Sequence, residues 1–341
     1  MKHQYIERET SRVRTEKLFS DPVVNLIYSG VRENAGFLFN LLISEKMSAL
    51  LGAITYDIPF RRNPSETRAF LIAQGIDPGE LAGRVADLDS YRKIFERQIR
   101  FWEVRPMPTE ASALVSPADA TVLVGSFSNG HPLFIKDKFF DYTDLVGPDK
   151  ACWQQAFFHG DVAVFRLTPE KYHYNHAPVS GIVKDVYAID GCFHSCNPGA
   201  VVREVTPLSK NRRVVTIINT DVPGGSRVGL VAMVEVVALM IGRIVQCYSK
   251  NRYDAPVPVR PGLFVEKGRP KSLFRPGSST TLLIFQRGRM TFSRDIVENM
   301  ARTDATSRFA EGFHSQLVET AVTVRSIIGN GLPLKNNTIK E

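Results

Sequence analysis

The chain has 341 residues, of which 43% are hydrophobic and 23% are charged, a composition typical of a folded globular protein. Its length allows one large domain or two, and its composition excludes a disordered or collagen-like chain. The formal net charge of +8 favours a partner that carries negative charge, such as nucleic acid, anionic lipid or an acidic substrate.

The N-terminal third is predicted to be helical. Three N-cap residues stand directly before a proline, at Asp21, Asn63 and Asp77. We expect the helix that begins after Asp77 to run on through residues 91–101, and apolar residues recur at roughly helical spacing after Asp21. These helices either pack on the next domain or lie in a membrane interface. We assign residues 1–105 to this region, which is a candidate for membrane association.

No targeting or membrane-spanning segment is expected. The first 20 residues are polar and carry both signs of charge, which argues against a signal peptide. No run reaches the roughly 18 to 20 apolar residues that cross a bilayer. The longest apolar run, residues 228–242, contains Glu235 and is predicted to form a buried pair of strands.

Two polar features carry little chemistry by themselves. The basic segment 243–275 contains no nucleic-acid-binding motif, so we expect no nucleic-acid partner, and a solvated face or an anionic membrane contact stays open. Cys192, His194 and Cys196 have no second ligand pair at zinc spacing, so we expect no metal, and their role stays open. Four cysteines are too few for a disulfide scaffold and are expected to be reduced.

After a proline-containing linker at residues 105–113, the pattern changes to short β-branched runs separated by Gly, Pro, Asn and Asp. Residues 106–341 are therefore predicted to form a β-rich catalytic domain, which makes the fold α+β. Within it we expect a hairpin in residues 282–292 and a returning strand in residues 319–329.

Three polar clusters of the β-rich part contain candidate catalytic residues. Asp119 lies in a turn, His173 and His176 are three residues apart, and Gly277-Ser278 precedes a β-run. Each cluster alone is common in proteins without a catalytic role. By residue type, Asp, His and Ser also form the triad of a hydrolase that retains its serine. However, no G-x-S-x-G elbow is present, which disfavours that alternative.

Four segments in this order resemble the pyruvoyl-dependent phosphatidylserine decarboxylases. They are LVSPADATV (114–122), RLTPEKYHYNHAPVSGIV (166–183), MVEVVALMIGRI (233–244) and VEKGRPKSLFRPGSSTTLLIF (265–285). The resemblance covers most of residues 113–290. It implies the catalytic fold of that family for the β-rich domain.

The resemblance also implies roles for individual residues. Asp119, His176 and Ser278 would carry out self-cleavage between Gly277 and Ser278, giving chains 1–277 and 278–341. Ser278 would become a covalent pyruvoyl cofactor that forms a Schiff base with the serine amine of the substrate. His173 would serve in the loss of CO2.

The implied reaction is the decarboxylation of phosphatidylserine to phosphatidylethanolamine by a peripheral protein on the cytoplasmic face of a membrane. The alternative is a pyruvoyl-dependent decarboxylase of a soluble amino acid. A non-catalytic relative that binds lipid is a further alternative, and a homo-oligomer stays open.

The sequence departs from the family around these motifs. Ala120 stands where the family usually has glycine, and Pro276 stands where it usually has leucine or glycine. Arg269 and Lys271 replace an acidic stretch, and Ser272 replaces a glycine. The catalytic residue types are intact, so these changes affect the expected substrate more than the expected processing.

Overall fold

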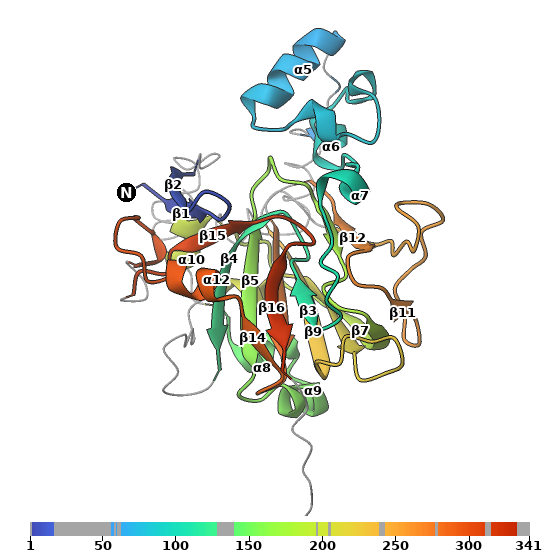
Figure 1. The fold of residues 1–341 in the computed structure, drawn as a ribbon, viewed down its shortest axis with the longest axis vertical. Coiled ribbons are helices and arrows are strands. Elements are labelled where there is room, and N and C mark those ends of the chain that lie inside the picture. The colour runs from blue at the N-terminus through green and yellow to red at the C-terminus, as the bar shows by residue number, and fades with distance from the viewer. Residues whose placement is uncertain are drawn as a thin grey trace, which may run out of the picture.

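A ten-stranded sheet forms the centre of the computed structural model (Figure 1). The described residues are 2–16, 56–57, 59, 63–127, 140–195, 197–203, 206–238, 243–276, 279–310 and 315–332. In spatial order the strands are β11 (Phe264–Val265), β7 (Gly181–Ile189), β8 (Arg213–Asn219), β9 (Leu230–Val237), β13 (Ser279–Phe285), β5 (Asp161–Leu167), β4 (Ala120–Ser126), β15 (Glu319–Val322), β1 (Gln4–Glu7) and β2 (Arg12–Thr15). Neighbours are antiparallel except β1 and β15, which are parallel.

Two three-stranded sheets accompany the central one. The first has the order β10 (Ile244–Gln246), β12 (Pro270–Phe274) and β6 (Tyr174–His176). The second has the order β14 (Met290–Phe292), β16 (Ile327–Gly331) and β3 (Ala113–Val115). Together with the central sheet and the helices, they confirm the α+β class.

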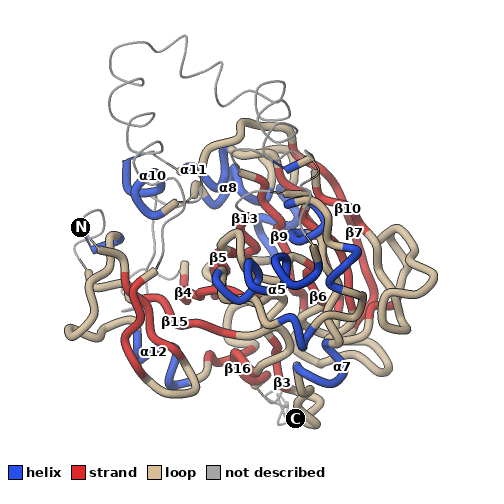
Figure 2. Tube along the Cα trace, turned by 90° about the horizontal axis from the view of Figure 1, so that it is seen from above, coloured by secondary structure: helices blue, strands red, loops and turns tan. Residues whose placement is uncertain are grey.

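The helices in the described part of the chain are short. They are α5 (Pro64–Ala73), η2 (Pro78–Glu80), η3 (Val85–Asp87), α6 (Tyr91–Phe95), α7 (Phe101–Val104), α8 (Tyr142–Val146), α9 (Ala151–Ala156), α10 (Pro198–Arg203), α11 (Pro207–Lys210) and α12 (Arg294–Asn299). Figure 1 places α5 and α6 beyond one end of the strands and α8 and α9 at the opposite end. Figure 2 views the strands from the side of α5.

β13 lies at the centre of the hydrophobic core. All seven of its residues are buried, and each is paired with β5 on one side and with β9 on the other. A strand that is covered on both faces needs a nearly continuous apolar or β-branched run, which Thr280–Phe285 supplies. Every residue of β4 is buried too, so the core extends along the middle of the sheet.

Several sequence predictions are confirmed. Most of the β-branched runs form strands, and residues 106–112 contain no helix or strand. Asn63 caps α5 with a capping box: its Oδ1 accepts from the Glu66 N–H at 2.9 Å, and Glu66 Oε2 accepts from the Asn63 N–H at 3.1 Å.

The prediction of one long helix from Asp77 through residues 91–101 was wrong. Asp77 caps only the three-residue turn η2, and residues 91–101 contain the short helix α6 and the first residue of α7. A β-bridge between Leu81 and Ile99 breaks the helical path, because a backbone that pairs with a distant segment cannot also make i→i−4 bonds. The Arg100 N–H likewise donates to the Glu80 carbonyl at 2.8 Å.

The hairpin predicted for residues 282–292 was also wrong. The chain does turn after β13, but β14 pairs with β16 in another sheet. Both edges of β13 are already occupied by β5 and β9, so no edge is left for β14. The expected returning strand near the C-terminus is present as two strands, β15 and β16.

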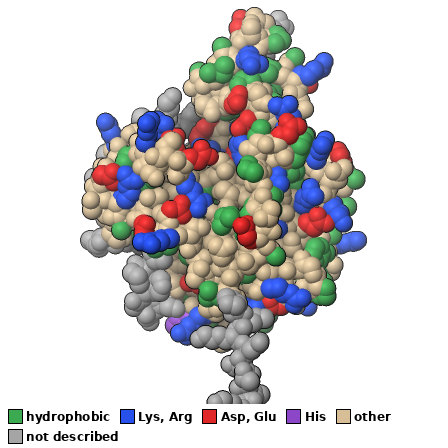
Figure 3. All heavy atoms as spheres, in the orientation of Figure 1, with side chains coloured by type: hydrophobic (Ala, Val, Ile, Leu, Met, Phe, Trp, Pro, Cys, Tyr) green, Lys and Arg blue, Asp and Glu red, His purple; other side chains and the backbone are tan. Residues whose placement is uncertain are grey.

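The strand pair predicted for residues 228–242 can be followed only in part. Leu230–Val237 forms the strand β9, seven of whose eight residues are buried, while residues 239–242 lie outside the described residues. The apolar segment that follows Asp21 lies outside them as well. Within the described ranges, no helix is long and apolar enough to cross a membrane. On the face drawn in Figure 3, cationic and anionic side chains are interspersed.

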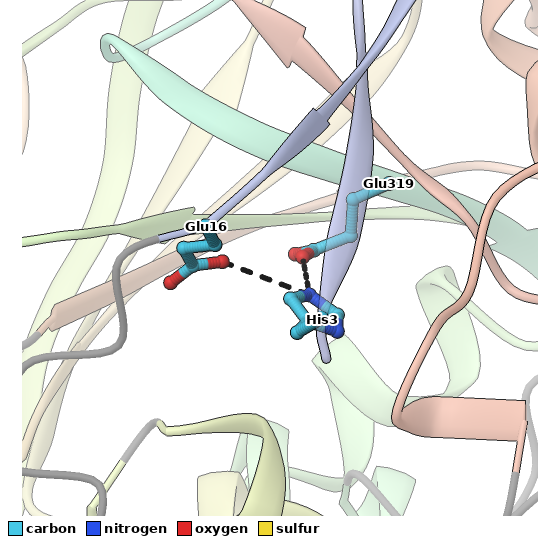
Figure 4. Close-up of side chains that lie close together, drawn as sticks. All are labelled: His3, Glu16 and Glu319. Carbon is cyan, nitrogen blue, oxygen red and sulfur yellow. Dashed lines mark hydrogen bonds and ion pairs between the residues drawn. The ribbon is translucent and has the colours of Figure 1, made fainter. Parts of the chain in front are cut away.

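The N-terminus differs from the expected helical start, because residues 4–15 form β1 and β2. A buried ion cluster anchors this hairpin (Figure 4). His3 Nε2 lies 2.7 Å from Glu319 Oε2 and 3.7 Å from Glu16 Oε2. Arg166 on β5 donates to Glu16 Oε1 at 2.8 Å and to Glu319 Oε1 at 3.1 Å.

The ligand atoms of His3, Glu16 and Glu319 lie within 4.8 Å of one another, a spacing that also suits a metal ion. Here the Arg166 guanidinium supplies the positive charge. Burial alone would lower the pKa of Arg166, but Glu16 and Glu319 raise it well above its usual value. Burial alone would raise the pKa of Glu319, but Arg166 and His3 hold it well below its usual range. We therefore interpret the cluster as a structural ion network.

Replacing Arg166 with methionine should lower the free energy of unfolding by about 3–5 kcal/mol at pH 7, because two buried carboxylates lose their partner. Urea denaturation measures this loss. The difference in unfolding free energy between the wild type and Arg166→Met should become smaller below pH 4.5, the usual Glu pKa, because Glu319 stabilises the fold only while its carboxylate is charged. Arg14→Met removes an exposed ion pair to Glu7 of the same hairpin and should change stability little. Equal losses in the two variants would contradict a buried network.

Candidate active site

His173 directly precedes β6, His176 is the last residue of β6, and β6 pairs with β12. The pairs include Leu273 with Tyr174, and the Phe274 N–H donates to the His173 carbonyl at 3.1 Å. β12 ends at Phe274, and β13 begins at Ser279. The Gly277-Ser278 bond therefore belongs to a four-residue connection, one end of which is held beside His173. Gly277 and Ser278 themselves lie outside the described residues.

His173 is completely buried and stacks on Phe95, with ring centroids 3.5 Å apart and an interplanar angle of 15°. Its Nε2 lies 3.4 Å from the Pro169 carbonyl oxygen, and its Nδ1 has no hydrogen-bond partner among the described residues. Burial, and then the positive charge of Arg97, lower the pKa of His173 well below its usual value. The imidazole is therefore neutral at pH 7.

His176 is also completely buried. Its Nδ1 lies 2.9 Å from the Gly268 carbonyl oxygen, and since a carbonyl only accepts, Nδ1 carries the proton. Nε2 then accepts from the Tyr172 hydroxyl at 2.9 Å, which lies 2.7 Å from the Tyr253 hydroxyl. Burial lowers the pKa of His176 to about 3, so its Nε2 is held in the unprotonated form that a base requires.

Asp119 lies at the start of β4 and is bound by Arg105 instead of His176. Arg105 donates to Oδ2 at 2.8 Å and to Oδ1 at 3.2 Å, and the Val324 N–H donates to Oδ1 at 2.7 Å. Burial alone would raise the pKa of Asp119, but Arg105 holds it below its usual range. Within the described part of the chain no hydrogen bond joins Asp119 to His176, although the Asp119 charge does raise the pKa of His176.

A buried ion pair ties β12 to the central sheet. Lys271 Nζ lies 2.8 Å from Glu235 Oε2 on β9, and both side chains are fully buried. Gln246 donates to the same carboxylate oxygen at 2.7 Å, and Asn175 of β6 donates to Glu235 Oε1 at 3.3 Å. Thr281 of β13 donates to Asn175 Oδ1 at 2.9 Å. The network therefore contacts the strands on both sides of the 275–278 connection.

Sequence reasoning missed most of these supporting residues. Arg105 lies in the segment that was predicted to be a linker, and no role was predicted for Tyr172, which directly precedes His173. Glu235 did give a signal, because a lone carboxylate in an apolar run needs a buried partner. Of the residues Cys192, His194 and Cys196, whose role the sequence left open, Cys196 lies outside the described residues, and Cys192 is a half-buried free thiol.

The fold and site define an α+β enzyme domain with two buried, neutral histidines on the segment that pairs with β12, one of them beside the connection from β12 to β13. The family model for phosphatidylserine decarboxylase matches residues 91–311. The chain therefore belongs to the phosphatidylserine decarboxylase family and is a decarboxylase, which confirms the resemblance seen in its motifs.

Curated relatives agree with this assignment. The chain is 29% identical to a phosphatidylserine decarboxylase proenzyme of Chlamydia trachomatis, over 86% of this chain and 90% of the relative. Proenzymes of the same name from Clostridium tetani and Fusobacterium nucleatum are 26% and 25% identical, over 86% and 87% of this chain and 91% and 92% of the relatives.

The buried histidines predict an acid-sensitive fold. The pKa of His176 is about 3 in the folded protein and 6.5 as a free side chain, so the unfolded state binds more protons between these values. Stability should therefore be fully present above pH 6.5 and fall below it, by about 1.4 kcal/mol per pH unit for each such histidine. Urea denaturation between pH 7 and pH 5 measures this slope. His176→Gln should reduce it, and an unchanged slope would contradict a neutral buried His176.

Proposed function

We propose that the chain cleaves itself between Gly277 and Ser278 and then decarboxylates phosphatidylserine with a pyruvoyl group derived from Ser278. One observation carries the proposal: the connection that contains this bond joins two separately held strands and starts beside the buried, neutral His173, while the buried, neutral His176 pairs with Pro270 at the other end of β12.

Cleavage requires a base for the serine hydroxyl. His176 Nε2 is unprotonated and takes the proton as Ser278 Oγ attacks the Gly277 carbonyl carbon. The bond from this carbon to the Ser278 nitrogen then breaks, His176 passes the proton to the departing nitrogen, and the peptide bond has become an ester with a free amine. Because Nε2 accepts from Tyr172 in the structure, the tyrosine hydroxyl either relays the proton or moves aside. β-Elimination then releases the Gly277 carboxylate and leaves dehydroalanine at position 278. Addition of water and loss of ammonia give the pyruvoyl group.

Asp119 assists this step by its charge. It raises the pKa of His176 without a direct hydrogen bond, and so makes proton transfer to the imidazole less unfavourable. Arg105 keeps Asp119 ionised and fixes its carboxylate. This arrangement differs from a triad in which the carboxylate contacts the imidazole directly.

Both new chain ends would stay in place after cleavage. β13 keeps its seven residue pairs with β5 and its seven with β9. β12 keeps its pairing with β6 and the buried Lys271–Glu235 ion pair. These contacts support a mature enzyme in which the two chains remain associated.

The residues around the connection fit a small carbonyl-bearing group. Ser279 Oγ and His173 Nδ1 are both buried and lack hydrogen-bond partners among the described residues. The Ser279 hydroxyl can donate to a carbonyl or carboxylate oxygen, whereas His173 Nδ1, in a neutral ring whose Nε2 faces the Pro169 carbonyl, can accept from a donor such as water. The pyruvoyl group supplies a ketone that takes up the substrate amine and withdraws the electron pair released with CO2. His173 holds or delivers the proton that replaces the carboxylate.

The substrate would be met at a membrane. We infer peripheral binding to the cytoplasmic face, since phosphatidylserine lies in the bilayer and the net charge of +8 favours an anionic leaflet.

Ser278→Ala removes the nucleophile and should leave one chain of 38.1 kDa. Intact-mass measurement distinguishes this from the wild type, which should give fragments 1–277 and 278–341. The neighbouring Ser279→Ala serves as the matched control and should still be cleaved after Gly277. Cleavage of the Ser278→Ala chain at this bond would refute the assigned nucleophile, and an uncleaved wild type that hydrolyses esters would favour a retained serine.

His173→Ala should still cleave itself but lose at least about 100-fold of its decarboxylation rate, a typical contribution of one general acid or base. The readouts are intact mass and CO2 release from phosphatidylserine vesicles. His159→Asn, which changes a histidine outside the site, controls for general effects. Failure of His173→Ala to cleave would mean that the two histidines exchange roles. If CO2 were released only from a free amino acid, the substrate would be that amino acid and not the lipid.

A further inference from the structure

Arg97 is a buried cation that has no ionised partner in the part of the chain that the structure describes. Its side chain is 7% exposed, and its guanidinium donates to the Ile94 carbonyl at 3.1 Å and to the Glu170 carbonyl at 2.7 Å. Across the described ranges no carboxylate lies within ion-pair distance of it. A guanidinium has five N–H donors, so these two bonds leave donor capacity open, and the charges of Asp119, Glu80 and Glu170 act on Arg97 only from beyond ion-pair distance.

Arg213 shows how this fold stabilises a purely structural buried arginine. It too has no carboxylate partner within the described residues, but carbonyls accept from all three of its nitrogens: Leu145 at 3.0 Å, Asn211 at 2.8 Å, and Asp144. Arg97 has one carbonyl fewer. Burying a charge without compensation is costly, so the incomplete set of partners around Arg97 indicates that an anion completes the site.

The Arg97 guanidinium lies beside the candidate proton donor. Phe95, two residues before Arg97, stacks on the His173 ring, and Glu170 belongs to the loop that carries His173. The Arg97 charge is close enough to lower the pKa of His173. His173 Nδ1 is fully buried and has no hydrogen-bond partner among the described residues. A cation and a ring nitrogen, both short of partners, thus lie together next to β12.

We infer that Arg97 binds the phosphodiester of the substrate headgroup and selects a phospholipid over a free amino acid. The inference rests on the proposed function. Two substrate groups are anionic, the carboxylate and the phosphodiester. An arginine on the carboxylate would stabilise a charge that must disperse as CO2 leaves, which favours the ground state over the transition state. The phosphodiester keeps its charge throughout, and a planar guanidinium fits it with two parallel hydrogen bonds.

Equilibrium binding tests this site without requiring turnover. The probes are glycerophosphoethanolamine, which has the phosphodiester, ethanolamine, which has neither anion, and serine, which has only the carboxylate. Wild-type protein should bind glycerophosphoethanolamine at least about tenfold more tightly than ethanolamine. Arg97→Gln should weaken glycerophosphoethanolamine binding by about 10–100-fold, the range for hydrogen bonds to a charged group, and leave ethanolamine binding unchanged.

Two further variants complete the design. Arg97→Lys keeps the charge without the fork and should lose less affinity than Arg97→Gln. If Arg97→Gln does not fold, Arg97→Lys takes its place. The site would then be contradicted if Arg97→Lys lost less affinity for glycerophosphoethanolamine than for ethanolamine. Arg213→Lys is the matched control at a buried arginine, and its affinity for glycerophosphoethanolamine should equal that of the wild type.

Three outcomes would overturn the inference. Equal wild-type affinity for glycerophosphoethanolamine and ethanolamine would mean that the protein makes no stabilising contact with the phosphodiester. An unchanged affinity in Arg97→Gln would assign any such contact to another residue. If the Arg97→Gln variant lost its affinity for serine but kept its affinity for glycerophosphoethanolamine, Arg97 would bind the substrate carboxylate instead of the phosphodiester. Intact mass and CO2 release, measured in parallel, report separately on self-cleavage and decarboxylation, so failure of the proposed function is distinguishable from failure of this site.

Discussion

The pairing of β13 between β5 and β9 is the constraint on which the rest of the structure depends. Ser279 is the first residue of this central strand, and only Ser278 separates it from the candidate cleavage bond. Fourteen backbone pairings, seven on each side, fix its position before and after any cut. The Lys271–Glu235 pair does the same for β12. The proposed bond is therefore the part of the chain that can break while its flanks stay rigid.

The electrostatics of the site follow from burial. Two histidines are neutral because burial disfavours their charged form. Asp119 stays ionised because Arg105 compensates it. Burial lowers the pKa of Arg97 to about 10, and among the described residues no carboxylate forms an ion pair with it. The result is a buried site with a base ready to accept a proton and a cation that can take an anionic substrate group.

The sequence predicted the strands of the core and the catalytic residue types, but few of their contacts. Runs such as residues 161–167 were identifiable because β-branched residues and flanking turns are local signals. The partner of each strand is not local, so the hairpin in residues 282–292 was predicted wrongly. For the same reason the sequence did not predict the ion pairs that support the site: Arg105 is 14 residues from Asp119, and Lys271 is 36 residues from Glu235. No local pattern encodes such pairs.

The wrongly predicted helix in residues 91–101 lies in the segment that completes the site. Its local pattern favours a helix, yet the Leu81–Ile99 bridge interrupts it. With this interruption, three side chains make three different contacts. Phe95 stacks on the His173 ring, Arg97 donates to the Glu170 carbonyl, and Arg105 donates to Asp119. Where local preference is overruled by tertiary contacts, a functional reason is expected. Here the broken helix brings two buried arginines to the two candidate catalytic groups, a task that a regular helix, with side chains at fixed 100° steps, is poorly suited to perform.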